Sequence, residues 1–151
     1  MTVSREAVYS ALFALGQGIT WGTPPVTWVF TMRRVMTPDQ VVGQMPAICQ
    51  GEYLEEVQQI TRMPQKRTWA AAWFIYHYAG SSDDIPATVT NQILDAIDLL
   101  FPADDQRPGA RRQTLGGLVH KVWIEGRIEK YGGTGMDGQV LIVVPLRILV
   151  P

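Results

Sequence analysis

The chain has 151 residues, of which 46% are hydrophobic and 18% are charged, and its formal net charge is −1. This composition excludes a disordered chain and predicts one folded domain, spanning residues 1–151, with a sizeable core. The near-neutral charge argues against nucleic acid or an anionic membrane as the main partner, because phosphate binding requires an excess of lysine and arginine on one face.

Cys49 is the only cysteine, so the sequence excludes an intrachain disulfide and a cysteine zinc site. The N-terminal residues lack the basic and apolar regions of a secretory signal. No uncharged apolar run approaches the ~18 residues that a membrane-spanning helix needs. We therefore expect a soluble intracellular protein.

The N-terminal segment predicts a helix followed by a strand. Ser4 is a suitable N-cap, and Gly16 and Gly18 indicate where the helix ends. Between them, apolar residues recur at helical spacing: Val8, Ala11, Leu12 and Leu15. After a proline-rich turn, residues 28–35 are rich in aromatic and β-branched side chains, which is typical of a strand.

The next part of the chain is less regular. Residues 36–45 show no sustained period, although a single helical turn at 39–42 is compatible with them. Residues 46–50 are short, apolar and led by a proline, which predicts a strand that begins at that proline. Residues 51–66 are polar, and we expect either a mobile loop or a projecting hairpin that leads into the next strand.

Residues Lys66–Tyr78 form the most distinctive stretch, and their aromatic content predicts a long central strand. One face would carry Trp69, Ala71, Trp73, Ile75 and His77, and the other Thr68, Ala70, Ala72, Phe74, Tyr76 and Tyr78. Neither face is polar. We therefore expect a helix to cover one face, and another layer or another subunit to cover the second.

A second helix is predicted after this strand. Asp83 or Asp84 would cap it, Pro86 suits its first turn, and Pro102 would end it. Its apolar stripe consists of Val89, Ile93, Ala96, Ile97 and Leu100.

The C-terminal third predicts two further strands. Residues 114–119 are compatible with a short helix or with the start of a strand, and residues 122–129 alternate as a strand with one charged face. A glycine-rich turn leads to a final apolar strand at 140–150, in which Pro145 requires a bulge or an edge position. The order of elements predicts an α+β domain, with an antiparallel or mixed sheet and two main helices packed on it.

The sequence offers no recognisable catalytic or metal-binding motif. His77 and His120 lie in or beside apolar strands, and no pair of histidines or cysteines has metal-ligand spacing. The glycines at 132–135 precede a strand rather than a helix, so a hairpin turn is favoured over a phosphate loop. The carboxylate pairs fall in polar segments, where solvated surface is the better interpretation. We therefore expect no enzymatic activity, no cofactor and no metal.

The charged residues Glu125, Arg127 and Glu129 alternate along the predicted strand, and they fit a solvated face and a row of intersubunit ion pairs equally well. The central strand has more tyrosine and tryptophan than one small helical layer easily covers, and these residues often anchor protein interfaces. The low charged fraction agrees with a surface used for protein contact.

Several segments, in this order, resemble a known family of structural proteins. They are the aromatic strand at 69–78, DDIPAT at 83–88 leading into ILDAI at 93–97, QTLGGLV at 113–119, WIEGRIE at 123–129, and VPLRILVP at 144–151. MRR at 32–34 followed by PAI at 46–48 is similar to what prophage tail proteins of this size carry. Together these segments resemble the tail terminator proteins of long-tailed bacteriophages, the lambda-like minor tail protein U group.

The resemblance implies a non-enzymatic virion protein that forms a six-fold ring. Such a ring caps the tail tube, stops its polymerisation and presents a surface to the head connector, so the expected partners are further copies of the chain, the tube protein and the connector. The protein would occupy the head-proximal end of the tail, and the host cytoplasm during assembly. By analogy, the segments at 36–45 and 52–67 would project towards the tube or the connector.

The predicted interface residues are the cations in or beside these segments and the three alternating charged residues of the strand at 122–129. They are Arg33, Arg34, Arg62, Lys66, Arg67, Glu125, Arg127 and Glu129. Alternative functions are another neck or tail component, such as a head–tail joining protein or a tube subunit, and a structural module of some other assembly. A small enzyme or ligand-binding domain is a further alternative, and His77 would be its first candidate residue.

Overall fold

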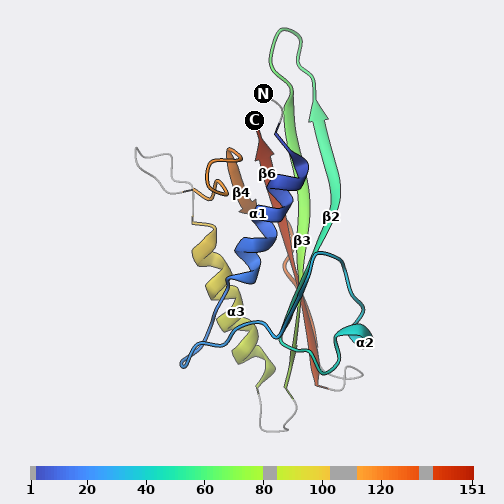
Figure 1. The fold of residues 1–151 in the computed structure, drawn as a ribbon, viewed down its shortest axis with the longest axis vertical. Coiled ribbons are helices and arrows are strands. Elements are labelled where there is room, and N and C mark those ends of the chain that lie inside the picture. Colours follow the sequence, from blue (N-terminus) through green and yellow to red (C-terminus); the bar gives the residue numbers. More distant parts are fainter. Residues whose placement is uncertain (1–2, 80–84, 103–111, 133–137) are drawn as a thin grey trace.

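The computed structural model describes residues 3–79, 85–102, 112–132 and 138–151 (Figure 1). The elements in chain order are α1 (Arg5–Gln17), β1 (Phe30–Met32), α2 (Pro38–Val41), β2 (Ala47–Gln58), β3 (Lys66–Tyr78), α3 (Pro86–Leu100), β4 (Lys121–Ile124), β5 (Glu129–Tyr131) and β6 (Gln139–Val150). The strands form one six-stranded mixed sheet. The predicted α+β class is therefore confirmed, with α1 and α3 as the two main helices.

The two longest strand pairings hold the sheet together at its centre. The order is β1-β2-β3-β6-β4, and β5 also pairs with β6. Only the short pair β1–β2 is parallel. β3 has the predicted bounds, and its antiparallel register with β6 runs without a shift from Arg67 opposite Val150 to Tyr78 opposite Gln139.

Both main helices lie on the same face of the sheet (Figure 1). Alternate residues of β6 are buried beneath this helical layer: Val140, Ile142, Val144, Leu146, Ile148 and Val150. The predicted apolar stripe of α3 packs here, with Ile93 and Ile97 fully buried. α1 approaches the sheet closely at Gly16, where a Cβ atom would lie 3.1 Å from side-chain atoms of Ile48.

The helix ends agree with the predictions in part. Ser4 caps α1, because its hydroxyl accepts a hydrogen bond from the Ala7 amide at 3.2 Å. The residue before α3 is Ile85, and Pro86 takes the first helical position as predicted. The aspartates predicted as caps for this helix, Asp83 and Asp84, lie outside the described residues.

Several predicted boundaries in the N-terminal half change. The strand predicted at 28–35 shortens to β1, and the helical turn predicted at 39–42 is found one residue earlier as α2. The strand predicted at 46–50 continues as β2 to Gln58, past a bulge between Glu52 and Leu54. The polar segment that follows Gly51 is therefore a projecting hairpin, which was one of the two alternatives.

The strand predicted at 122–129 is wrong, because the structure has two short strands there. β4 ends at Ile124 and β5 begins at Glu129, and both pair with β6. Between them Gly126 has a φ of +117°, a conformation that favours glycine. The alternating pattern continues through this break, so it gave no warning. Residues 114–119, whose sequence is compatible with a short helix or with the start of a strand, form turns instead.

Pro145 corrects another expectation, since it lies in β6 at the centre of the sheet without a shift in the register with β3. Its carbonyl oxygen accepts a hydrogen bond from the Glu125 amide at 3.3 Å. The backbone nitrogen and carbonyl of Pro145 therefore face the break between β4 and β5. A Cβ atom on Gly126 would lie 3.3 Å from the Pro145 ring. A central strand tolerates the missing N–H here because its neighbour is interrupted at the same place.

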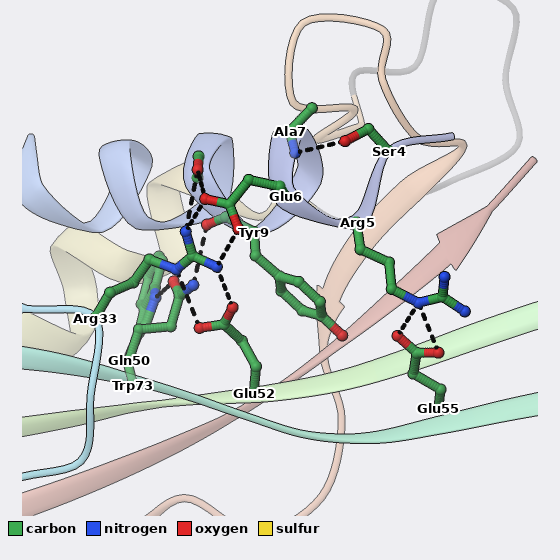
Figure 2. Close-up of polar contacts among 11 residues, drawn as sticks. Ser4, Arg5, Glu6, Ala7, Tyr9, Arg33, Gln50, Glu52, Glu55 and Trp73 are labelled. Carbon is green, nitrogen blue, oxygen red and sulfur yellow. Dashed lines mark hydrogen bonds and ion pairs between the residues drawn. The ribbon is translucent and has the colours of Figure 1, made fainter. Parts of the chain in front are cut away.

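Gln50 is a fully buried polar residue that joins three elements of the core (Figure 2). Its side-chain nitrogen donates to the Tyr9 carbonyl oxygen of α1 at 3.0 Å. Its side-chain oxygen accepts from the indole N–H of Trp73 on β3, also at 3.0 Å. One amide therefore satisfies polar groups on a helix and on the neighbouring strand, away from water.

Replacing this amide tests its contribution to stability. Gln50→Met keeps the side-chain length but leaves the Trp73 N–H without its partner, so we expect a loss of roughly 2–3 kcal/mol in the free energy of unfolding. Gln17→Met is the matched control, because the Gln17 amide donates to Thr31 Oγ1 at 2.9 Å in an exposed position. Urea denaturation should show a change within about 0.5 kcal/mol for the control. Equal losses in the two variants would contradict the assigned role.

Candidate functional site

The sheet face opposite the main helices is only partly covered by the chain itself. The segment that contains α2 packs over one end of this face, where a second apolar cluster consists of Met36, Val41, Ala47, Cys49 and Tyr76. The Tyr76 hydroxyl donates to the Met36 carbonyl oxygen within this cluster. The analogy predicted that residues 36–45 project from the ring towards the tube or the connector. Within the domain, Met36 and Val41 of this segment are buried in the cluster, and projection of the segment from an assembled ring stays a prediction.

The remainder of this face carries apolar side chains that stay partly exposed. They are Trp123 on β4 and Val143, Pro145 and Leu149 on β6, which we call the open face. The register places Trp123 opposite Arg147, whose side chain alternates with the buried residues of β6. Sheet residues in a finished protein usually have either a packed or a polar environment. On the open face, half-buried apolar side chains lie beside the charged side chains of Lys121 and Arg147, which makes it a candidate contact surface.

The β2–β3 hairpin is the second candidate surface, and it extends beyond the rest of the domain (Figure 1). It carries apolar side chains that are between 40% and 62% exposed: Tyr53, Leu54, Val57, Ile60 and Met63. Its tip is an ordered turn, in which the Met63 amide donates to the Ile60 carbonyl oxygen at 3.0 Å. A pre-formed hairpin with exposed apolar side chains is suited to packing against a partner protein. The prediction from sequence missed these residues, although apolar side chains recur among the glutamates of 52–57.

Ion pairs attach the base of the hairpin to α1 (Figure 2). The Arg33 guanidinium bridges Glu6 of α1 and Glu52 of β2, with N–O distances of 2.5 Å to each. Arg5 of α1 contacts Glu55 of β2 at 2.8 Å. Hydrogen bonds from Arg33, and then from Ser10, lower the pKa of Glu6. The hydrogen bonds that Arg33 makes with Glu52, and then with Glu6, raise the pKa of Arg33.

The predicted interface residues fall into three groups. Arg33 pairs within the chain, and Arg34 is exposed beside it with Nη2 3.3 Å from Met36 Sδ. The structure brings Arg62, Lys66 and Arg67 together in the hairpin, the first two exposed and the third partly buried. These three cations adjoin the exposed apolar residues of the tip, which gives the hairpin both charge and apolar area.

The third group is not the continuous row that the sequence predicted. Glu125 and Arg127 lie in the break between β4 and β5, whereas Glu129 begins β5. Glu125 contacts Arg147 at 3.4 Å. Glu129 accepts a hydrogen bond from the Tyr131 hydroxyl at 2.6 Å, and Arg127 is exposed. The backbone turn at Gly126 separates residues that an uninterrupted strand would place in line.

Cys49 is buried in the second apolar cluster. Burial raises the pKa of the Cys49 thiol, which is the opposite of an activated nucleophile. No group of three histidine, cysteine or acidic side chains within residues 3–79, 85–102, 112–132 and 138–151 could hold a metal ion. An open pocket of about 390 Å³ is lined by Val42, Gly43, Met45, Tyr78 and Gln139, which provide little chemistry.

His77 lies in the core between β3 and α3, rather than in a pocket. Its Nε2 atom is 2.8 Å from the Thr90 hydroxyl of α3, and its Nδ1 atom has no hydrogen-bond partner in the described part of the chain. Burial lowers the pKa of His77 below its ordinary value of 6.5. The folded protein therefore favours the neutral imidazole.

This histidine should make stability depend on pH. The unfolded chain binds a proton near pH 6.5, whereas folded His77 resists protonation, so its stabilising effect is complete above that pH and falls as the pH drops below it. Urea unfolding at pH 7.5 and pH 5.5 should show a smaller decrease for His77→Gln than for the wild type. His120→Gln, at an exposed position, is the control and should keep the full decrease. An unchanged pH dependence in His77→Gln would contradict the assignment.

The Arg33 bridge gives a second prediction, because it distinguishes a structural from an interface role. Arg33→Met removes the ion pair with the mostly buried Glu52 carboxylate, and we expect the free energy of unfolding to fall by about 1 kcal/mol. Arg34→Met is the matched control, with an expected change within about 0.5 kcal/mol. The difference should shrink in 1 M salt, where ion pairs are screened. Identical stabilities for the two variants would show that the bridge does not stabilise the fold.

The two candidate surfaces are identified from the structure, and no family assignment supports them. None of the described helices is long and apolar enough to cross a membrane. No protein-family model matches the chain, and no curated protein matches it. The role of the chain is therefore inferred from its own residues: an open apolar sheet face and a projecting hairpin that combines cations with exposed apolar side chains.

Proposed function

We propose that the chain is a structural protein that assembles with copies of itself into a ring, and that this ring caps the tube of a phage tail. The observation that carries the proposal is the presence of two different apolar surfaces on one domain, the partly exposed open face and the exposed hairpin. A closed ring needs a heterologous interface, and a ring that caps a tube needs further contact surface on each subunit. Both surfaces are built on the long central strands, which hold them at a fixed relation.

The segments quoted above resemble tail terminator proteins. This resemblance is the reason for proposing that the ring sits at the end of a phage tail. A terminator ring must bind copies of itself, the tube beneath it and the head connector above it. A single small domain therefore needs more contact surface than a monomer of the same size. The fifteen large apolar residues that are exposed on the described part of the chain support this role.

A non-enzymatic role is part of the proposal. His77 and Cys49 are buried. Arg33 and Glu52, which line an open pocket of about 360 Å³ at the base of the hairpin, are paired with each other. The same surfaces suit a tail tube subunit, which would polymerise without limit. The two alternatives differ in the size of the assembly they form, so mass in solution separates them.

Light scattering across a concentration series, with electron microscopy of the product, tests this function. We expect a discrete ring of six copies, which does not grow further at higher concentration. Val143→Lys places a charge on the open face and should weaken assembly about tenfold or more. Gln44→Lys adds the same charge at an exposed polar position and is the control.

Two outcomes would contradict this function. Open-ended polymers would identify a tube subunit instead. A monomer at every concentration, which also fails to bind assembled tail tubes, would exclude an assembly role.

A further inference from the structure

The tip of the hairpin has a definite chemical character. Ile60 and Met63 are at least half exposed, and Arg62 and Lys66 are exposed beside them. The glutamates of the hairpin lie farther down, on β2, where Arg33 and Arg5 already pair with Glu52 and Glu55. The tip is therefore basic and apolar, and it fits a surface that is acidic and apolar.

The outer side of α3 has the complementary character. Asp95 and Asp98 are the two charged residues of this helix, and both are exposed. Leu99 lies beside them and is 83% exposed. The stripe that faces away from the core continues with Asn91 and Gln92, which are exposed and uncharged.

One chain cannot bring these two surfaces together. The hairpin tip lies at one end of the molecule, well away from α3 (Figure 1). Both surfaces belong to elements that are fixed in the fold, the tip by the β2–β3 pairing and α3 by its buried stripe. Contact between them therefore requires a second copy.

Pairing between two hairpins is a poorer alternative. The free edge of β2 beyond Cys49 carries Glu52, Glu55 and Glu56. Antiparallel pairing of this edge with its own copy would bring glutamates near one another, and like charges across strands are destabilising. Charged residues along an exposed strand edge commonly prevent such pairing. The hairpin is thus better suited to contact a different surface.

We propose that the hairpin tip of one copy binds the outer side of α3 on the next copy. The occupant of each surface is then a second copy of this chain, joined by ion pairs from Arg62 and Lys66 to Asp95 and Asp98 around the exposed Met63 and Leu99. The contact rests on the self-assembly proposed above, and it specifies which surfaces meet. Because the two surfaces differ, the interface is heterologous and each copy uses one of each.

A reciprocal charge swap tests this contact. The hairpin variant combines Arg62→Glu with Lys66→Glu, and the helix variant combines Asp95→Lys with Asp98→Lys. Each variant alone places like charges on both surfaces, so its assembly should be weakened about tenfold or more relative to the wild type. An equimolar mixture of the two variants places opposite charges at every contact, and it should restore assembly with both variants in equal amounts.

Arg127→Glu is the control, because it reverses one exposed charge outside both surfaces. Urea unfolding of each variant should match the wild type, since all four substituted side chains are exposed. Single variants that assemble as the wild type does, or a mixture that fails to assemble, would overturn this contact and leave the proposed ring to other surfaces. A wild-type chain that never assembles would instead remove both proposals.

Discussion

The buried amide of Gln50 determines how the helical layer sits on the sheet. Burying the indole of Trp73 brings a polar N–H into an apolar core, and such a group is costly unless it has a partner. Gln50 supplies that partner and at the same time contacts the backbone of α1 at Tyr9. The position of α1 in turn allows Arg5 to reach Glu55 on the hairpin, and allows Glu6 to reach Arg33. A core hydrogen bond and a surface ion-pair network thus fix the same helix.

The second constraint is the imbalance between the two faces of the sheet. β3 is apolar on both faces, but the main helices cover only one of them. The segment that contains α2 covers one end of the second face, where it packs against Tyr76. The open face remains, and burying it would stabilise an assembly in the same way that core packing stabilises a domain. The proposed assembly would therefore use the same apolar strands that stabilise the fold.

The sequence predicted those features that depend on local composition and periodicity. The bounds of β3 follow from its run of aromatic side chains, and the buried stripe of α3 follows from apolar side chains that repeat every third to fourth residue. The break at Gly126 and the central position of Pro145 could not be predicted, because each depends on the other across the sheet. Arg33 was assigned to an interface for a similar reason, since its partners Glu6 and Glu52 are distant in sequence and meet only in the fold.

The interruption opposite Pro145 also bears on how the sheet could grow. The outer edge beyond β6 consists of two strands of three and four residues, set apart by the turn at Gly126. Such an edge offers no long row of backbone groups on which a strand of another molecule could add. Together with the glutamates of β2, it protects the chain from amyloid-like stacking while its apolar surfaces stay exposed. A protein can thus associate through its side chains while its strand edges prevent association through backbone hydrogen bonds.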